Sequence, residues 1–355
     1  MNVALFLKES KLLFDNGTKK LDIVIGNQSA DLDSIASAIS LAHYLAKVTE
    51  KKFIPIINST KSVIASKKTC TFMFEQLSVD LNDLVFLEDL VHDRIGEVYL
   101  VDHNELDKRE CDLRLSELVT GVIDHHLDKG EFKNANPRCI DTRVGSNASL
   151  IVSMITTGIE LDPSFANLLL FPIVNDTSNL TRIAHQIDID AVEYLTRFAS
   201  VDRNQLDKKL DNLKFNSDSN ETVSELLRQD LKMYTGLWAM SATNKGLVEW
   251  IRRGKNVADI VEFMDANDLA FFGILSLHRE EGVYKRDLVI FGKEQMVRGF
   301  VELKRSDLTF IDAVYSQTNC CAIFKVNDST LSRKHWQPVL EKYLRGFFHC
   351  NNKNE

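Results

Sequence analysis

The sequence predicts an α/β protein in which a parallel-sheet domain is followed by a smaller α+β domain. The chain has 355 residues. At roughly 100–200 residues per domain, this length corresponds to about two domains. In the first half, short β-rich runs alternate with helical stretches, a pattern typical of a parallel sheet covered by helices. In the second half, longer strands and helices mix without that alternation.

Five short strands are expected in the first domain, between helical stretches. Met1 to Phe14 places Leu and Phe at the spacing of an amphipathic helix, and Ser34 to Lys47 repeats apolar residues at i, i+3 and i+4. The β-rich runs between such stretches are expected to pair in parallel. They span residues 22–26, 53–57, 84–87, 97–102 and 121–124.

A polar segment marks the expected boundary between the domains. Val201 to Glu221 is rich in charged residues, and the pattern of strands and helices changes after it. We predict a first domain over residues 1–200 and a second, smaller domain over residues 207–350. The strands expected in the second domain span residues 237–241, 270–279, 286–291 and 320–325.

The composition excludes several classes of protein. An apolar fraction of 44% with only 15 Gly and 5 Pro excludes a disordered or collagen-like chain. The 43 Lys and Arg against 51 Asp and Glu give a net charge of −8, which argues against coating nucleic acid by bulk electrostatics. No apolar run approaches the roughly 18 residues that span a bilayer, and the six cysteines form no CxxC pairs. We therefore expect a cytoplasmic monomer without membrane or nucleic-acid partners.

Four acidic motifs in the first domain follow apolar, strand-like runs. They contain Asp31 with Asp33, Asp102 with His103, Asp124 with His125 and His126, and Asp176. Ligands of open parallel sheets gather outside the carboxyl ends of the strands, so we expect the four motifs to meet at one edge of the sheet. Each motif alone is more often a helix cap or a polar turn. Their joint occurrence favours a shared site.

Carboxylates that share a site raise one another's pKa, and a bound cation removes this conflict. Aspartate oxygens with one or two imidazoles suit Mn²⁺ or Mg²⁺, and Co²⁺ is also possible. Two such ions about 3.5–4 Å apart would clamp a phosphoryl group and turn a bridging water into a hydroxide nucleophile. The motifs therefore predict a two-metal site that hydrolyses a phosphate ester or anhydride.

In this combination and order, the motifs resemble those of the DHH phosphoesterase superfamily. The resemblance rests on Asp124-His125-His126, on Asn27-x-x-x-Asp31-x-Asp33 and on Val101-Asp102-His103-Asn104-Glu105. Two later segments resemble the basic motifs of the accessory domain shared by family II inorganic pyrophosphatases, prune-type proteins and yeast-type cytosolic exopolyphosphatases. These segments are Asp230-Leu231-Lys232 and Ser332-Arg333-Lys334-His335-Trp336-Gln337-Pro338.

The resemblance implies a role for each matching residue. The implied metal ligands are Asn27, Asp31, Asp33, Asp102, His125 and Asp176. His126 would contact the scissile phosphate or assist the leaving group, and the implied catalytic set is His126, Asp102, Arg333 and Lys334. The substrate would be bound by His126, by Ser146 and Asn147 at a helix start, and by a clamp of Lys232, Arg333 and Lys334. His103 is expected either to orient a ligand or simply to pack.

The residue at position 27 distinguishes the branches of this superfamily. Family II pyrophosphatases begin their first motif with His, whereas this chain has Asn27, as the exopolyphosphatases do. We therefore expect an exopolyphosphatase that removes the terminal phosphate of inorganic polyphosphate, with its site between the two domains. An inorganic pyrophosphatase, a prune-like nucleotide phosphodiesterase and a catalytically degenerate binding protein are the alternatives.

Overall fold

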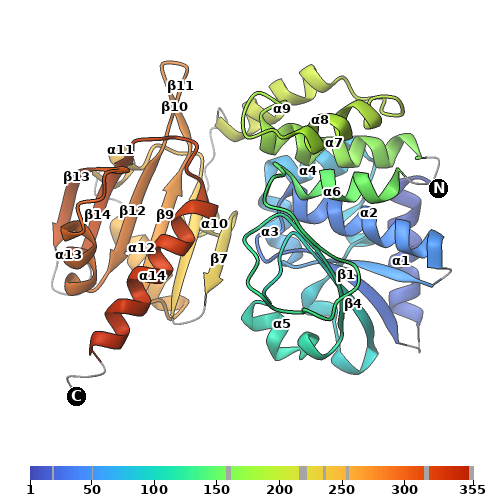
Figure 1. Cartoon of the computed structure of the whole chain (residues 1–355), viewed down its shortest axis with the longest axis horizontal. Coiled ribbons are helices and arrows are strands. Elements are labelled where there is room, and N and C mark those ends of the chain that lie inside the picture. The colour runs from blue at the N-terminus through green and yellow to red at the C-terminus, as the bar shows by residue number, and fades with distance from the viewer. Residues whose placement is uncertain are drawn as a thin grey trace. The chain divides into compact units, whose positions relative to one another are not determined.

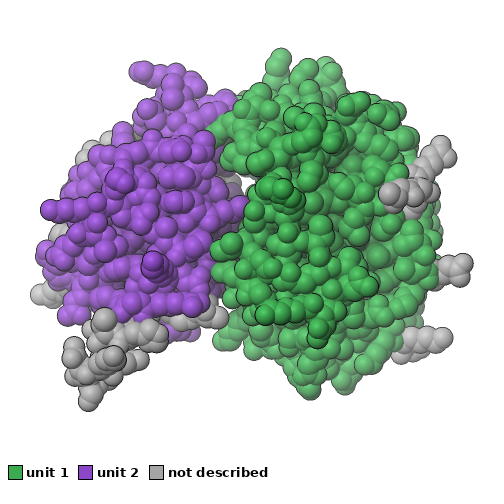
Figure 2. Space-filling model, viewed as in Figure 1, with its two compact units in different colours: residues 1–216 green, residues 217–355 purple. Residues whose placement is uncertain are grey.

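Two compact units make up the chain in the computed structural model. They comprise residues 1–216 and 217–355, which Figure 2 shows in separate colours. The first unit contains a parallel sheet and the second a mixed sheet, so the predicted fold class is confirmed. The structure describes residues 1–17, 20–49, 51–156, 161–215, 222–234, 237–252, 256–315 and 320–351.

A six-stranded parallel sheet forms the centre of the first unit (Figure 1). Its strand order is β3-β2-β1-β4-β5-β6, so the direction of winding reverses between β1 and β4. In open sheets of this kind, the reversal opens a crevice at the carboxyl ends of the two strands beside it. The strands are β1 (Leu21–Ile25), β2 (Phe53–Ile57), β3 (Val85–Phe86), β4 (Ile95–Val101), β5 (Val119–Asp124) and β6 (Arg138–Ile140).

The central strand β1 is apolar because both faces of the sheet are covered. Val24 packs into the apolar core that contains the residues of α2, α6 and α7, whereas Ile23 and Ile25 pack with Phe14 on the opposite face. Strands covered on both faces read as continuous apolar runs, which is why this sheet was predictable. Only its edges differ from the prediction: β3 is two residues long and β6 was not predicted.

Helices pack on this sheet at the spacing that their sequences indicate. The helix expected over 34–47 is α2, which contacts β1, β2, α6 and α7, and the amphipathic stretch at the start of the chain is α1. The helices of the unit are α1 (Val3–Asn16), α2 (Leu32–Thr49), α3 (Lys61–Ser66), α4 (Lys68–Gln76), α5 (Lys108–Asp112), α6 (Asn147–Ile155), α7 (Pro163–Thr177), α8 (Gln186–Leu195) and α9 (Arg203–Phe215). Short 3₁₀ helices span residues 81–83, 87–89, 92–94 and 115–117.

The apolar run before Asp176 is a helix, so the prediction that all four acidic motifs follow strands is wrong for this one. Asp176 lies in the last turn of α7. Every residue of this helix from Phe165 to Val174 is buried. A helix that is apolar all round loses the periodicity that distinguishes a surface helix from a strand.

The polar segment between the predicted domains is largely helical. Its described part contains α9, whose Leu206 and Leu210 pack into the same apolar core as α7. Residues 216–221 lie outside the described residues. Among the described residues, no helix combines the length and apolar character needed to cross a membrane.

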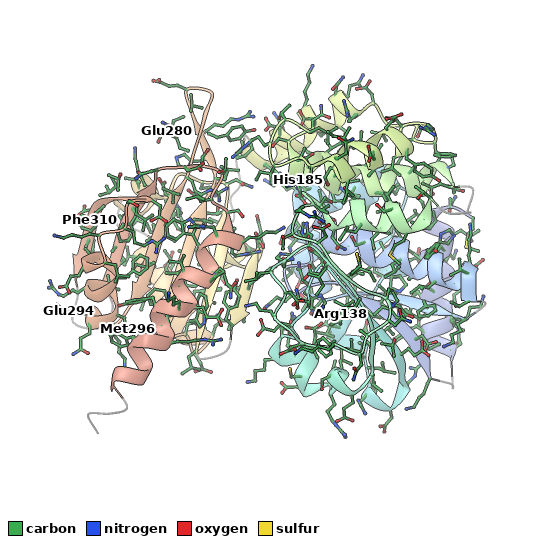
Figure 3. The ribbon with its side chains drawn as sticks, in the orientation of Figure 1. Arg138, His185, Glu280, Glu294, Met296 and Phe310 are labelled. Carbon is green, nitrogen blue, oxygen red and sulfur yellow. The ribbon has the colours of Figure 1, made fainter. Side chains whose placement is uncertain are left out.

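The second unit is built on a mixed sheet in the order β13-β14-β12-β9-β8-β7. Only β8 and β9 pair in parallel among these neighbours. The predicted strand over 270–279 is two strands, because β10 leaves the sheet to form a hairpin with β11, on which Glu280 lies (Figure 3). The strands are β7 (Leu231–Tyr234), β8 (Trp238–Thr243), β9 (Phe271–Ser276), β10 (His278–Glu280), β11 (Val283–Lys285), β12 (Asp287–Gly292), β13 (Leu308–Tyr315) and β14 (Cys320–Val326).

The two edge strands of this sheet, β7 and β13, were not predicted. All four residues of β7 are partly buried, and on β13 Phe310, labelled in Figure 3, is 49% exposed. Such strands lack the apolar run that identifies the central strands. The helices of the unit are α10 (Val223–Arg228), α11 (Leu247–Arg252), α12 (Val257–Ala266), α13 (Glu294–Glu302) and α14 (Arg333–Asn351).

Candidate metal centre

Three of the four acidic motifs meet at the carboxyl ends of the central strands. β1 is followed by Asn27 and Asp31, β4 by Asp102, and β5 ends at Asp124, directly before His125. β4 pairs with both β1 and β5, so these strand ends are adjacent at the reversal of the sheet. Asp102 has a φ of 61°, a left-handed conformation that Asp tolerates better than most residues. The chain therefore turns sharply as it leaves β4.

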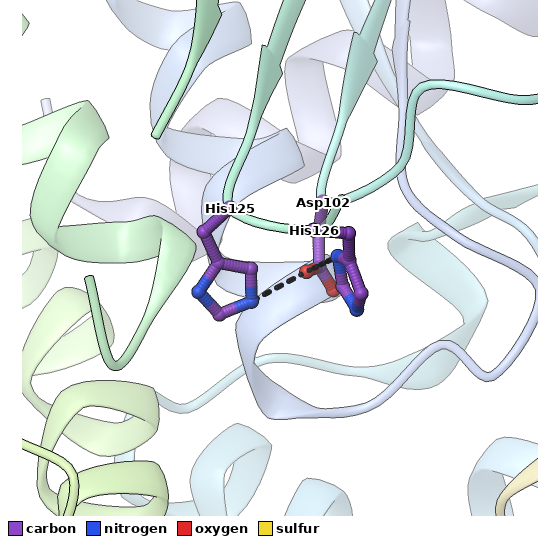
Figure 4. A group of neighbouring side chains, drawn as sticks. All are labelled: Asp102, His125 and His126. Carbon is purple, nitrogen blue, oxygen red and sulfur yellow. Dashed lines mark ion pairs between the residues drawn. The ribbon is translucent and has the colours of Figure 1, made fainter. Parts of the chain in front are cut away.

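The ring of His125 presents Nε2 to two carboxylates. Nδ1 lies 3.2 Å from the carbonyl oxygen of Val144, which only accepts hydrogen bonds, so the neutral ring carries its hydrogen on Nδ1. Nε2 then faces Asp102 Oδ1 at 3.2 Å (Figure 4). It also lies 3.7 Å from Asp33 Oδ2. On a neutral ring, Nε2 would place a lone pair against two carboxylate oxygens, which is repulsive unless a proton or a metal ion lies between them. This donor set fits a divalent metal ion.

Asp33 is held by the N-terminus of helix α6. Its Oδ1 accepts hydrogen bonds from the Ser146 hydroxyl and the Ala148 N–H, both at 2.8 Å. Its Oδ2 accepts from the Asn147 N–H at 2.6 Å. Ser146 and Asn147 are fully buried. Their predicted contact with substrate stays a prediction, and their hydrogen bonds are made to a predicted metal ligand.

Burial and neighbouring carboxylates shift the pKa of Asp33. Burial, followed by the charges of Asp102, Asp176 and Asp31, raises the pKa of Asp33 well above its ordinary value. The effect of Asp176 on Asp33 shows that the end of α7 is close to the strand motifs. A bound divalent cation would reverse the shift, because it favours the ionised form of each carboxylate.

Asn27 turns its amide nitrogen toward Asp102. Its Nδ2 donates to Asp102 Oδ2 at 2.6 Å and to the Asp102 carbonyl oxygen at 3.2 Å. Its Oδ1 accepts from the Ser29 N–H at 2.9 Å and the Ser29 hydroxyl at 2.7 Å. Since a backbone N–H only donates and a carbonyl only accepts, these partners fix the orientation of the amide. Asn27 as a metal ligand stays a prediction, while its bonds hold Asp102 in place.

His126 is oriented by the buried carboxylate of Asp124. Its Nδ1 lies 2.8 Å from Asp124 Oδ1 and 3.5 Å from Asp102 Oδ1, so Nδ1 carries a hydrogen. Burial alone would raise the pKa of Asp124, but the charges of His126 and His125 and hydrogen bonds to the carboxylate lower it. The side chain of His126 is 26% exposed against 5% for His125. Ligand atoms of Asp102, His125 and His126 lie within 4.8 Å of one another.

His103 does not face the carboxylate cluster but ties helix α5 to the end of β4. Its Nδ1 lies 2.9 Å from the carbonyl oxygen of Val101, and its Nε2 lies 2.9 Å from Glu110 Oε1. Burial alone would lower the pKa of His103, but the charge and hydrogen bond of Glu110 raise it to about 9. Of the two expectations for His103, packing and support of the strand end agree with these contacts.

Lys67 is buried, although the Lys67-Lys68 pair in the sequence favours ordinary surface charge. It lies between α3 and α4, is 6% exposed, and donates to the carbonyl oxygens of Ser29 and Ala30. These carbonyls belong to the loop that carries Asn27 and Asp31. A lysine in a polar loop has no sequence signal for burial, so only the structure reveals this contact.

The two basic motifs of the second unit meet through an ion pair. Arg333, the first residue of α14, donates from Nη1 to the Asp230 carbonyl oxygen at 2.8 Å and from Nη2 to Asp230 Oδ1 at 2.7 Å. Asp230 directly precedes β7, which contains Lys232, and Lys334 follows Arg333 on α14. The structure thus brings together two motifs that are 103 residues apart in the sequence.

Comparisons with known proteins agree with this organisation. The chain matches the family model described as the DHH family N-terminal domain over residues 23–173 and the DHHA2 domain model over residues 208–343. Fold and site together define an α/β protein with a candidate centre for divalent metal ions at the reversal of its parallel sheet. The protein belongs to the DHH family, in the branch whose second domain is of the DHHA2 type.

Curated relatives match along most of the chain. A Schizosaccharomyces pombe protein named "Putative exopolyphosphatase" is 29% identical over 349 residues, which is 89% of each chain. Human "Exopolyphosphatase PRUNE1" is 28% identical over 358 residues, 93% of this chain and 77% of the relative. The solved structure of a protein described as "Methanococcus jannaschii putative family II inorganic pyrophosphatase" has the same fold. Its TM-score is 0.68 at 19% identity, covering 91% of this chain and 99% of that one.

Proposed function

We propose that the protein is a metal-dependent exopolyphosphatase that removes the terminal phosphate of inorganic polyphosphate. The observation that carries the proposal is that His125 Nε2 faces Asp102 and Asp33, beside a His126 held by Asp124. The names of the Schizosaccharomyces pombe and human relatives support polyphosphate as the substrate.

The residues of the first unit would hold two divalent ions, Mn²⁺ or Mg²⁺, with Co²⁺ also suitable. Such ions supply Lewis acidity and offset the charge of the phosphoryl group during its transfer. Asn27 and the N-terminus of α6 orient Asp102 and Asp33 through hydrogen bonds, so these carboxylates are placed before any ion binds. The proposed ligands are Asn27, Asp31, Asp33, Asp102, His125 and Asp176.

His126 is the proposed proton carrier of the reaction. A water oxygen attacks the terminal phosphorus, the bond from that phosphorus to the bridging oxygen breaks, and the shortened chain leaves. Asp124 holds the Nδ1 hydrogen of His126, so Nε2 is the atom that would donate a proton or a hydrogen bond to the leaving oxygen. The ionised Asp124 stabilises the charged form of the ring.

Basic residues of the second unit are the proposed phosphate clamp. The planar guanidinium of Arg333 suits a grip on two phosphate oxygens, and Lys232 and Lys334 supply further positive charge. Asp230 fixes the direction of Arg333 through its carbonyl and carboxylate oxygens. Ser146 and Asn147, predicted as further substrate contacts, are proposed to act through Asp33.

Phosphate release from long-chain polyphosphate, measured with Mn²⁺, Mg²⁺ or Co²⁺ and with EDTA, tests the proposal. The wild type should release phosphate only with a divalent ion. His126→Gln and Asp102→Ala should abolish most of the release, whereas His92→Gln should not, because His92 contacts the Leu113 carbonyl and not the cluster.

The same assay separates the alternatives. Faster phosphate release from pyrophosphate than from long-chain polyphosphate would identify a pyrophosphatase, and release from cyclic or tetraphosphate nucleotides would identify a prune-like phosphodiesterase. Tight binding of polyphosphate without hydrolysis under every metal condition would identify a binding protein. The predicted monomeric state would be checked by light scattering of the purified full chain.

A further inference from the structure

We propose that Asn104 is a positioning residue that orients His126 through Asp124. The inference rests on the proposed function, because it assigns His126 a part in the reaction. Asn104 follows β4 two residues after Asp102, and its side chain is 4% exposed. The hydrogen bonds of its side chain go to Asp124, Leu127 and Lys129, none of which is a proposed metal ligand.

The amide of Asn104 makes hydrogen bonds on both sides of His126. Nδ2 donates to Asp124 Oδ2 and, at 3.2 Å, to the carbonyl oxygen of Leu127. Oδ1 accepts from the backbone N–H of Lys129 at 2.8 Å. The Leu127 carbonyl only accepts and the Lys129 N–H only donates, so the amide has one possible orientation. One side chain therefore fixes the chain before and after His126.

Asp124 divides its two oxygens between Asn104 and the histidines. Its Oδ1 accepts from the backbone N–H of His125 at 2.7 Å, the backbone N–H of His126 at 3.1 Å and Nδ1 of His126 at 2.8 Å. Its Oδ2 accepts from Asn104. Asp124 is fully buried, so water cannot replace a lost donor without a change of structure. Without Asn104, the carboxylate loses the contact that opposes its rotation, and the ring of His126 loses its fixed partner.

The chemistry at position 104 requires an amide. An aspartate would have the same shape, but it could not donate to Asp124 or to the Leu127 carbonyl, and it would bring a second carboxylate against Asp124. An alanine would remove all three hydrogen bonds of the side chain. Asn104→Asp therefore tests the amide donor alone, and Asn104→Ala tests all three hydrogen bonds of the side chain.

Asn167 on α7 provides a matched control. It is also buried, at 8% exposed, and its amide likewise makes three hydrogen bonds that close a loop. Nδ2 donates to the Ser200 hydroxyl at 2.9 Å, and Oδ1 accepts from the backbone N–H groups of Ser200 and Val201 at 3.0 and 3.2 Å. Asn167→Ala removes an equivalent set of three hydrogen bonds, none of which involves Asp124 or His126.

The experiment measures kcat and KM for polyphosphate in saturating Mn²⁺, and the Mn²⁺ affinity of each full-length variant by calorimetry. Asn104→Ala and Asn104→Asp should lower kcat by about tenfold or more, while KM and Mn²⁺ affinity change by less than about threefold. Asn167→Ala should keep kcat within about twofold of wild type, even if its melting temperature falls as much as that of Asn104→Ala. An unchanged kcat in Asn104→Ala, or a loss of Mn²⁺ affinity as large as the loss of kcat, would overturn the proposal.

A double variant tests whether Asn104 acts through His126. Adding Asn104→Ala to His126→Gln should reduce kcat no further, whereas independent roles would multiply the two losses. A readout without turnover separates this inference from the proposed function. In the metal-free protein, the Nδ1 proton signal of His126 should be retained in Asn167→Ala and lost in Asn104→Ala. If the wild type releases no phosphate but this signal behaves as expected, only the proposed function fails; an unaltered signal in Asn104→Ala contradicts the inference itself.

Discussion

Asp102→Asn should stabilise the metal-free protein and remove most of its response to Mn²⁺. In the wild type, Asp102 Oδ1 and Asp33 Oδ2 lie 3.2 and 3.7 Å from the same nitrogen of His125. An asparagine at position 102 still offers an oxygen to Asn27 Nδ2, and its new amide group can donate to the His125 lone pair. The substitution therefore removes one of the crowded charges and offers an amide hydrogen to His125.

The magnitude follows from these distances. The two carboxylate oxygens are at most about 7 Å apart, and two unit charges at that separation repel by about 2 kcal/mol at an effective dielectric constant of about 20. At a pH above the raised pKa of Asp33, where both carboxylates are ionised, removing this repulsion should raise the melting temperature in EDTA by roughly 4–8 °C, since about 1 kcal/mol corresponds to about 2–4 °C in a unit of this size. Mn²⁺ at about 100 times its Kd should stabilise the wild type by about 2.7 kcal/mol per site.

Thermal unfolding with EDTA and with a titration of Mn²⁺ measures both effects. The Asp102→Asn protein should melt above the wild type in EDTA and below it in saturating Mn²⁺. Asp22→Asn is the control, because Asp22 lies at the opposite end of β1, where it accepts a hydrogen bond from the Glu97 N–H. Its shift with Mn²⁺ should equal that of the wild type. The reasoning is refuted if Asp102→Asn gains as much from Mn²⁺ as the wild type does, or melts below it in EDTA.

Three further predictions concern stability and substrate binding. Burial lowers the pKa of His43 from 6.5 to about 4, so the unfolded chain binds this proton first and stability is lost as the pH falls from about 6.5 toward 4. In urea unfolding, the free energy of unfolding should fall between pH 7 and pH 4.5 by on the order of 2 kcal/mol less in His43→Leu than in the wild type. An unchanged pH dependence would contradict the assignment. Ser146→Ala should destabilise the metal-free protein by about 1.5–3 kcal/mol through its lost bond to Asp33 and leave the KM for polyphosphate unchanged; a raised KM with unchanged stability would instead support a direct substrate contact. Arg333→Ala should raise that KM by roughly tenfold or more, about 1.4 kcal/mol, and equal kcat/KM in variant and wild type would exclude Arg333 from the clamp.

The central architecture was predictable because its signals are local. β1, β2, β4 and β5 are covered on both faces, so their apolar runs stand out in the sequence. The edge strands carry weaker signals. β3 and β6 are very short, and β13 leaves apolar side chains such as Phe310 and Val314 exposed. Helix α7 misled the prediction for the opposite reason, since burial on all sides hides its helical period.

The meeting of the strand-end motifs was predictable from the sequence, but the hydrogen bonds that connect their side chains were not. Adjacent strands bring the motifs of Asp102 and His125 together, and the sheet pattern was enough to expect this. The bond between Asp33 and Ser146 joins residues 113 positions apart, and no local pattern encodes it. Asn104 stood within a recognised motif, yet its role depends on which way its amide points, which the sequence does not specify.

The order of the motifs along the chain also sets the order in which the site is completed during synthesis. Asp31, after β1, and Asp33, in the first turn of α2, leave the ribosome first, Asp102 follows, and His125 arrives only with the end of β5. The carboxylates therefore exist in the nascent chain before the imidazole and before the α6 N-terminus that holds Asp33. A translating chain stopped short of α6 would carry the acidic residues without the framework that orients them. The proposed ligand set is complete only once α7, whose last turn carries Asp176, has emerged.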